Sequence, residues 1–497
     1  MTSRLAVSLA VFFLLASIAV IITVAVIQVH KTNFLSPGLK YGIVLDAGSS
    51  RTTVYLYQWP AEKENNTGVV TQTLKCRVEG PGISSFGQDP DQDRCTWHSM
   101  KECMAQTLET IPLSQHNSTP LFLGATAGMR LLRSKNESAS DKILLDIRRY
   151  LQSLPFSFGN ASIISGEEEG LYGWITANYL MGNFVEKNLW NAWVRPHGAK
   201  TIGSLDLGGA STQIAFSTTP AEGQAPPGYT KVWLYGYEYS VYTHSFTCYG
   251  KDEAERKVLA SLVRTSSSSQ VKNPCYHTGY STTMSAGYIF ETPCNQKTSN
   301  YNPKQQLTLV GTGDLGLCRS TVRAAFDLGS CQGRSNCSFN GVYQPPVSGD
   351  FVAYAGFSYI TEMFGLNQSF SLDAFDSKIR SHCSLPWKTL TEGSSKKEKY
   401  LRSYCYSANL AYVLLVEGYK FSPETWNNIR FQNEINQNSV AWPLGYMLAL
   451  SNMIPAEAKL VQLPMASSVF AGLLFMFSTL AILCFMFLAI ALVRACY

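Results

Sequence analysis

Two glycine-rich segments of this 497-residue chain carry residue types that can bind phosphate. Asp46–Thr52 (DAGSSRT) and Asp206–Thr212 (DLGGAST) share the pattern D-x-G-[SG]-x-x-T, and each lies between two hydrophobic runs. Glycine lets the backbone approach a ligand closely, and successive N–H groups in such a turn form a nest for phosphate oxygens. An aspartate at a strand end cannot hold phosphate itself, but it can hold a divalent cation that does. Ordinary hairpins also use Gly and Asp, but the matched pair predicts two loops that clamp successive phosphates.

A cluster of carboxylates lies between the two loops. Ser165–Gly170 (SGEEEG) places three glutamates at a turn before a helical run, and Gly124–Arg130 (GATAGMR) is a small, polar segment after a strand. Hydrolysis of a phosphoanhydride needs a base that orients water for in-line attack, and a glutamate is suitable. Acids are also favoured at helix N-termini by the helix dipole. The residues alone favour that structural explanation over a catalytic one.

The segments that must position these residues alternate between strand and helix patterns. Apolar and β-branched runs predict strands at 39–46, 53–57, 121–125, 204–206 and 212–216. Helical spacing predicts helices at 142–154 and 400–415. This alternation predicts an α/β fold. Because each glycine loop joins a pair of strands, we expect two lobes that face a shared cleft.

Both ends of the chain are apolar. Residues 5–29 and 469–493 are uncharged stretches of 25 residues each, and about 20 residues are enough for a helix to cross a membrane. The alternatives are a cleaved signal peptide for the first, which would have a shorter apolar region, and a removed lipid-anchor signal for the second. We expect two transmembrane helices with cytosolic tails at 1–4 and 494–497.

The region between the apolar ends has the composition of a secreted domain. It holds eleven of the 13 cysteines, most of which should pair in an oxidising compartment, although the odd number leaves at least one over. It also holds six N-x-[ST] glycosylation triplets, which begin at Asn65, Asn117, Asn136, Asn160, Asn336 and Asn367. The net charge of +5 argues against nucleic-acid binding, and 45% hydrophobic residues exclude a disordered chain.

With these motifs, the chain resembles the ecto-nucleoside triphosphate diphosphohydrolases, the apyrase family, in its cell-surface subgroup with two membrane anchors. The five apyrase regions follow in order at Asp46–Thr52, Thr119–Leu132, Ile164–Gly182, Asp206–Phe216 and Ala441–Leu450. The resemblance implies two ribonuclease-H-like lobes of the actin, heat-shock ATPase and sugar kinase superfamily, with an interlobe cleft. Lobe I would comprise 36–165 and 435–462, and lobe II would comprise 166–434. Within the family we expect most similarity to types 8, 1 and 2, and Ser330–Pro346 favours type 8.

The resemblance also implies roles for single residues. Glu169 corresponds to the catalytic base, which reverses the interpretation from the residues alone, and Thr126 and Gln213 help to position the attacking water. Asp46 and Asp206 correspond to residues that hold Ca²⁺ or Mg²⁺ through water. Phosphate contacts are expected from Gly48, Ser49, Ser50, Arg51, Gly208, Gly209, Ala210 and Ser211, and base stacking from Tyr359 and Tyr404. Three positions depart from the family pattern, namely Arg51 (usually His), Glu167 (usually Gln) and Pro443 (usually small or Thr).

A set of five disulfides is implied by the same resemblance. The pairs are Cys76–Cys103, Cys248–Cys294, Cys275–Cys318, Cys331–Cys337 and Cys383–Cys405. Cys95 is then left over, and we expect it to be an unpaired surface thiol.

The function implied by the resemblance is that of an ectonucleotidase of the plasma membrane, with its catalytic domain outside the cell. It would remove terminal phosphates from extracellular ATP, ADP, UTP and UDP and so regulate purinergic signalling. The alternatives are a two-pass ligand-gated channel, which the short tails disfavour, and a catalytically inactive nucleotide receptor, which the intact acids disfavour. The expected partners are extracellular nucleotides and the lipid bilayer, with no nucleic acid. Small residues in the second apolar segment permit a homo-oligomer through the membrane helices.

Overall fold

The computed structural model describes most of the chain. The described residues are 4–34, 38–189, 193–198, 200–218, 227–297, 302–334, 336–367, 369–392, 394, 397–455 and 467–496. The expected lobe boundaries at 36 and 462, and most of the N-terminal tail, lie outside these residues. The chain divides into two units, one containing both terminal helices and the other spanning Lys40–Trp59 and Lys63–Pro455.

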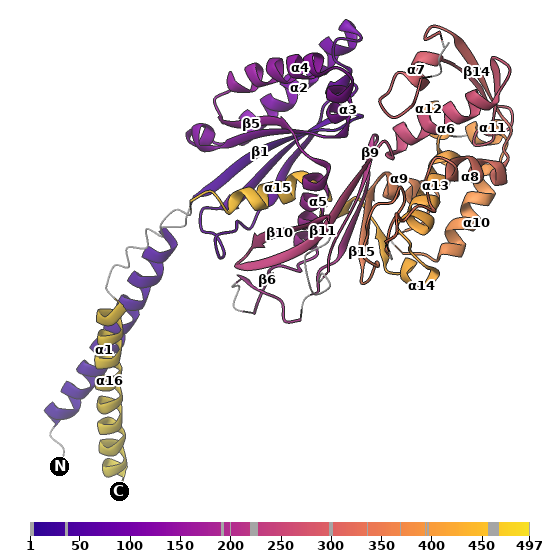
Figure 1. Cartoon of the computed structure of the whole chain (residues 1–497). Helices are drawn as coiled ribbons and strands as arrows, with labels where there is room; N and C mark the ends of the chain where they lie inside the picture. The colour runs from indigo at the N-terminus through magenta and orange to yellow at the C-terminus, as the bar shows by residue number, and fades with distance from the viewer. Residues whose placement is uncertain are drawn as a thin grey trace. The chain divides into compact units, whose positions relative to one another are not determined.

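The first unit is a pair of apolar helices. Helices α1 (Arg4–Phe34) and α16 (Ser467–Cys496) pack against each other (Figure 1). The stretches Arg4–Gln28 and Ser468–Arg494 are long and apolar enough to cross a membrane, and their side chains are largely exposed. These helices agree with the two expected membrane spans.

Lobe I is built on a five-stranded sheet in the order β3-β2-β1-β4-β5. One face packs against two helices, which contribute Met100, Met104 and Ile147 to the core, and the other face packs against α5 and α15 through Trp174, Trp442 and other apolar side chains. The elements are β1 (Leu39–Ala47), β2 (Thr52–Pro60), β3 (Thr71–Arg77), α2 (Pro90–Thr110), β4 (Pro120–Ala125), α3 (Ala127–Lys135), α4 (Glu137–Gln152), β5 (Ser157–Ile163) and the returning α15 (Trp442–Ser451), with 3₁₀ turns at Ile83–Ser85 and Leu113–Ser118.

Lobe II repeats this arrangement on a six-stranded sheet, β10-β11-β9-β8-β15-β16 (Figure 1). Strands β11-β9-β8-β15-β16 follow the same order as β3-β2-β1-β4-β5 of lobe I. Strand β15 is parallel to β8 and to β16, whereas β9 is antiparallel to both β8 and β11. The elements are α5 (Gly166–Leu180), β8 (Gly203–Leu207), β9 (Ser211–Ser217), β10 (Tyr229–Leu234), β11 (Tyr237–Thr247), α6 (Lys251–Thr265), β15 (Phe351–Ala355), α9 (Gly356–Met363), α10 (Leu372–Cys383), α13 (Tyr404–Tyr412), α14 (Pro423–Trp426) and β16 (Ile429–Phe431). The expected two-lobed α/β fold is confirmed.

Smaller elements complete the second unit. A three-stranded sheet, β12-β14-β13, adjoins lobe II, and two short strand pairs are β6–β7 and β17–β18. Their bounds are β6 (Glu186–Lys187), β7 (Trp193–Val194), β12 (Gln270–Asn273), β13 (Ser281–Ser285), α7 (Ala286–Phe290), β14 (Gln306–Gly311), α8 (Leu315–Arg323), α11 (Trp387–Thr391), α12 (Glu398–Leu401), β17 (Glu434–Ile435) and β18 (Asn438–Ser439).

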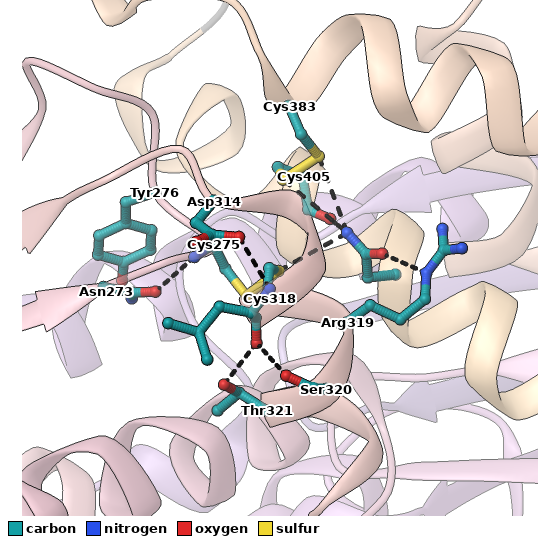
Figure 2. Close-up of a disulfide and its surroundings, with 12 residues drawn as sticks. Asn273, Cys275, Tyr276, Asp314, Cys318, Arg319, Ser320, Thr321, Cys383 and Cys405 are labelled. Carbon is teal, nitrogen blue, oxygen red and sulfur yellow. Dashed lines mark hydrogen bonds between the residues drawn. A yellow bond between two sulfur atoms is a disulfide. The ribbon is translucent and has the colours of Figure 1, made fainter.

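All five expected disulfides are present, and Cys95 is free and exposed. Figure 2 shows two of the bridges, Cys275–Cys318 and Cys383–Cys405, close together. The side-chain amide of Asn409 lies between them, 3.6 Å from the Cys318 sulfur and 3.8 Å from the Cys383 sulfur. The two bridges and this amide therefore join α8, α10 and α13 at one point of lobe II.

Two predicted helices differ from the observed ones at their ends. Helix α4 begins at Glu137 rather than at residue 142, because the Asn136 side chain caps it by accepting from the Ala139 N–H at 3.0 Å. The helix predicted at 400–415 is divided: α12 ends at Leu401, α13 runs from Tyr404 to Tyr412, and a π-helical turn covers Val413–Gly418. Apolar periodicity does not separate α from π turns, because both bury one face.

Candidate active site

A cavity of about 320 Å³ lies between the lobes and is lined by residues from both. Its wall includes every residue of the two glycine loops for which phosphate contacts are expected: Gly48, Ser49, Ser50, Arg51, Gly208, Gly209, Ala210 and Ser211. It also includes the three acids Asp46, Glu169 and Asp206. The fold thus brings together at one place loops that lie 160 residues apart in the sequence.

The two loops are held by close backbone packing. In lobe I, a Cβ at Gly82 would lie 2.5 Å from the backbone oxygen of Ser49, and one at Gly128 would lie 2.8 Å from the Ser49 Cα. In lobe II, the N-terminus of α6 holds the loop, because Asp252 N–H donates to the Gly209 carbonyl at 2.8 Å. Gly82 and Gly128, which lie outside the two loops, therefore allow the close backbone approach that positions the lobe I loop.

The loops also approach each other. A Cβ at Gly209 would lie 2.5 Å from the Ser50 hydroxyl and 2.6 Å from the Ser49 hydroxyl. Ser50 Oγ donates to Asp252 Oδ2 at 3.0 Å, which links the lobe I loop directly to helix α6 of lobe II.

Glu169 lies in the first turn of α5, whose start is fixed by a capping box between Ser165 and Glu168. The carboxylate of Glu169 is 8% exposed, and its Oε2 accepts from Arg130 Nη2 at 2.8 Å and from Gln213 Nε2 at 3.1 Å. Burial raises the pKa of Glu169, and the adjacent Arg130 guanidinium opposes that rise. The capping acid, Glu168, and the cavity-lining acid, Glu169, are thus different members of the glutamate run, so the helix-start explanation accounts for Glu168 and leaves Glu169 available to the cavity.

Asp46 and Asp206 occupy matching strand ends, but their surroundings differ. Burial raises the pKa of Asp46 to about 7, while a hydrogen bond from Trp442 lowers it and the charge of Glu169 raises it. Trp442 Nε1 donates to Asp46 Oδ1 at 2.9 Å. Burial and the charges of Glu169 and Asp46 raise the pKa of Asp206 well above its usual range.

The indole of Trp442 reaches Asp46 because β4 has glycine at position 124. A Cβ at Gly124 would lie 2.4 Å from the Trp442 ring. Gly124 is the register partner of Asp46 on the parallel strand β4. The indole therefore lies over the backbone of one strand and donates to a side chain of the next.

The acids of the cavity fit a divalent cation. Asp46 and Asp206 are half-buried carboxylates whose pKa values are raised by loss of water and partly by the charge of Glu169, so their ionised forms lack sufficient positive partners. Hard cations such as Ca²⁺ and Mg²⁺ take carboxylate and water oxygens as ligands. Among the described residues no group of three or more His, Cys, Asp or Glu side chains could hold a metal ion directly.

Polar side chains surround the Glu169 carboxylate. Gln213 Nε2 lies within hydrogen-bonding distance of Glu169, of Ser211 Oγ at 2.7 Å and of Ser245 Oγ at 2.9 Å. It carries two hydrogens, so it can donate to only two of these three acceptors at a time. The Gln213 Oε1 is buried and has no partner among the described residues. Thr126 precedes α3 without making a side-chain cap and lines the cavity. These groups can bind a water molecule beside Glu169.

Arg130 donates to Glu169 and belongs to the polar segment Gly124–Arg130, but the sequence pattern predicts no role for it. Its Nη2 also donates to Ser211 Oγ at 3.2 Å, and its Nη1 donates to the Ile164 carbonyl at 3.0 Å. The available signal was a cationic residue in the first turn of the helix that follows β4, close to Thr126 in the sequence.

The expected base-binding tyrosines are not placed alike. Tyr359 lines the cavity and is 48% exposed, as a stacking residue requires. Tyr404 is not on the cavity wall, and its ring lies 6.4 Å from that of His382. Lys251, which the sequence did not indicate, lines the cavity and is paired with Asp252 at 2.6 Å.

Two basic residues of β3, Arg77 and Lys75, were not predicted to line the cavity. They pair in register with Thr53 and Tyr55 of β2, and Arg51 directly precedes that strand. All five line the cavity, because directly opposed residues of antiparallel strands share one face. The alternation in KCR (75–77) was the available signal.

The three departures from the family pattern have distinct surroundings. Arg51 lines the cavity and lowers the pKa of Asp46 by its charge. Glu167 is exposed in the first turn of α5. Pro443 lies in the first turn of α15, where proline costs no helical hydrogen bond.

The six expected glycosylation asparagines, Asn65, Asn117, Asn136, Asn160, Asn336 and Asn367, are all exposed. Their exposure is compatible with attached glycans. At Asn136 the side-chain oxygen caps α4, which leaves the nitrogen for a sugar.

Comparison with known proteins gives a consistent family. The profile of the GDA1/CD39 (nucleoside phosphatase) family matches residues 33–463. Ectonucleoside triphosphate diphosphohydrolase 3 of Homo sapiens is 53% identical over 485 residues, which is 97% of this chain and 91% of the relative. Ectonucleoside triphosphate diphosphohydrolase 8 of Rattus norvegicus is 45% identical over 435 residues, which is 87% of each chain. These identities correct the expectation of type 8, because the type 3 relative is more similar; the Ser330–Pro346 segment was too short to decide the type.

A solved structure shares the fold. The crystal structure of nucleoside triphosphate hydrolases from Neospora caninum aligns with a TM-score of 0.54 over 85% of this chain and 94% of that chain. Its sequence identity is 16%, so the likeness concerns the fold alone.

Proposed function

The chain belongs to the GDA1/CD39 (nucleoside phosphatase) family, and we propose that it is a membrane-anchored ectonucleotidase that removes terminal phosphates from nucleoside tri- and diphosphates. The observation that carries the proposal is the position of Glu169, a buried carboxylate held by Arg130 and Gln213 beside two facing glycine loops. The two apolar terminal helices supply the anchor.

In the proposed reaction Glu169 accepts a proton from a water molecule. The water oxygen forms a bond to the terminal phosphorus while the bond from that phosphorus to the bridging oxygen breaks. The electron pair of the broken bond leaves with the shortened nucleotide. Gln213, which contacts the Glu169 carboxylate, and Thr126, on the cavity wall, would orient the water, and Arg130 would fix the carboxylate rotamer.

The two glycine loops would bind the phosphates. Backbone N–H groups near Gly48 and Gly208–Ala210, with the hydroxyls of Ser49 and Ser211, line the cavity on opposite sides. Donors that are already positioned stabilise the developing negative charge without reorganisation. A divalent cation held by Asp46 and Asp206 through water would supply further positive charge to the phosphate oxygens when bound.

The nucleobase would lie against Tyr359, whose half-exposed ring offers a face for stacking. Stacking on an aromatic face selects weakly among bases, so purine and pyrimidine nucleotides are both expected as substrates. Tyr404 remains a weaker proposal for base contact, because it does not line the cavity.

The direct test is phosphate release from ATP and ADP by the membrane-bound full-length chain. We expect Glu169→Gln to lower kcat by at least about 10³-fold, because the amide cannot accept the proton. Normal surface abundance and thermal stability of the variant would show that the fold is intact. Full activity of Glu169→Gln would refute the mechanism.

Two finer points belong to the same proposal. We expect Ca²⁺ and Mg²⁺ each to restore activity after chelation, because the carboxylate and water donors suit both. We also expect the catalytic domain at the outer face of the plasma membrane, which surface biotinylation of intact cells would test. ATP-evoked current without phosphate release would instead favour a channel.

A further inference from the structure

A second cavity, about 380 Å³ in volume, lies on lobe II and contains none of the proposed catalytic residues. Its walls come from the Cys331–Cys337 loop, from residues 344–347 and from residues 420–425. Leu328, Pro345 and Pro346 give it apolar surface, and Gln344 and Lys420 give it polar groups. A hollow of this size and mixed character is typical of a small-molecule site.

An exposed asparagine at this cavity is the start of a glycosylation triplet. Asn336 lines the cavity and begins Asn336-Cys337-Ser338. None of the other five glycosylation asparagines lines this cavity or the catalytic one. A sugar attached at Asn336 would therefore start at the cavity wall, whereas the others would start on open surface.

The chemistry of the cavity suits a sugar ring. An N-acetylglucosamine has an apolar C–H face, a methyl group and a polar hydroxyl edge. The proline and leucine carbons can cover the first two, and the exposed Lys420 ammonium, which also donates to the Glu417 carbonyl, can face the third. We propose that the innermost N-acetylglucosamine of a glycan on Asn336 occupies this cavity and braces the loop that carries it.

Covalent attachment makes weak contacts sufficient. A tethered group binds at an effective concentration of about millimolar or more, so that an intrinsic affinity of the same order fills the site. No such advantage exists for a free sugar, which the cavity would bind weakly.

Hydrogen bonds connect the segment after the Cys331–Cys337 loop to the second glycine loop of the catalytic cavity. Ser338 Oγ donates to the Gly418 carbonyl at 2.9 Å, and Gln344 Nε2 donates to the Tyr419 carbonyl at 2.9 Å. The Tyr419 hydroxyl lies 3.0 Å from Thr212 Oγ1, which in turn donates to the Asp206 carbonyl at 2.7 Å. The seated sugar would thus stabilise the packing that ends at the second glycine loop.

The test uses the full chain from glycosylating cells, and it rests on the extracellular placement proposed above. Peptide N-glycosidase is applied to the folded protein, and release is followed at each site by mass spectrometry. We expect the Asn336 glycan to be released at least about ten times more slowly than those at Asn117 and Asn160, because its attachment is covered. Pro346→Ser, at an exposed wall residue, should speed the release at Asn336 alone.

Thermal stability supplies a second readout. Asn336→Gln should lower Tm by about 2 °C, whereas Asn117→Gln should leave it unchanged. Ser338→Thr is the matched control, because it keeps both the triplet and a hydroxyl for the Gly418 carbonyl.

The outcomes are separable. Equal release at all sites, equal Tm for Asn336→Gln and Asn117→Gln, or an unmodified Asn336 on a chain with glycans elsewhere would overturn the proposal while leaving the proposed function intact. A chain without glycans at any of the six sites would overturn both this proposal and the extracellular placement.

Discussion

The two lobes carry the same kind of loop at the same strand end, yet the side chains around the two loop aspartates differ. In lobe I the aspartate, Asp46, accepts a hydrogen bond from Trp442 and lies near the charge of Arg51. In lobe II no side chain in the described part of the chain lowers the pKa of the Asp206 carboxylate in this way. The strand topology is therefore the same in both lobes, but among the described residues only the charge of Asp46 is stabilised by neighbouring side chains of this kind.

The second loop position shows the same division. Lobe I has Ser49 where lobe II has Gly209, and a Cβ at Gly209 would collide with the Ser49 and Ser50 hydroxyls. The first glycines, Gly48 and Gly208, are equivalent: a Cβ at either would lie 3.1 Å from a carbonyl within its own loop. One lobe thus supplies the hydroxyls and the other supplies the space for them.

The largest expected effect concerns the unsupported aspartate. Asp206→Asn should lower kcat/KM by about 10³-fold, because it removes a charge that would hold the cation. In chelator it should also raise Tm, because it removes a half-buried carboxylate whose charge no side chain among the described residues compensates. Asp46→Asn should raise Tm less, because Trp442 already stabilises its charge. Equal Tm changes would contradict the asymmetry between the lobes.

The second effect concerns the loop contact. Gly209→Ala should lower kcat/KM by about 10²-fold, because the new methyl group forces the loops apart by a fraction of an ångström. Steady-state phosphate release measures this, and Gly208→Ala is the control in the same loop. If both variants behaved alike, the contact between the loops would have no special weight.

A third variant removes the support of Asp46. Trp442→Phe keeps an aromatic ring over Gly124 but deletes the N–H that binds Asp46. We expect about a tenfold weaker cation activation, with kcat at saturating cation less affected, because this donor orients a ligand of the cation. A titration of activity with Mg²⁺ measures the change. An unchanged titration would show that the strand alone orients Asp46.

The smallest expected effect is on the pH profile. Arg130 opposes the burial that raises the pKa of Glu169. Arg130→Lys keeps the charge but loses the forked donors, so the pKa of Glu169 should rise and the acid limb of kcat/KM should move to higher pH. The sign follows because the base acts only when ionised. We expect a severalfold loss at the plateau, and a shift to lower pH would contradict the role of Arg130.

Much of the site could be predicted from sequence because its motifs are local. A loop such as DAGSSRT specifies its own turn, and an acid at a strand end follows from the same short segment. Residues acting across long separations were harder to identify. The hydrogen bond from Trp442 to Asp46 and the positions of Arg130, Lys251 and Arg77 were not predicted, because no local pattern reports which side chains meet across a cleft.

The segment around Tyr404 shows a second limit of sequence patterns. The apolar spacing at 400–415 is periodic, but a π turn at Val413–Gly418 and a break before Tyr404 set where the side chains lie. Periodicity reports which face is buried and not how the turns are wound, so the tyrosine placement could not follow from it.

The sequence by itself determined the two apolar anchors, the alternation of strands and helices, and the paired glycine loops, because each depends on neighbours within a few residues. The tertiary structure decided which aspartate is supported, which glutamate faces the cavity and which cations line it. These depend on contacts between segments tens to hundreds of residues apart, and such contacts exist only once the two sheets have packed. Strand order follows local patterns and is therefore the same in both lobes, whereas the partners of Asp46 and Asp206 come from distant segments and therefore differ.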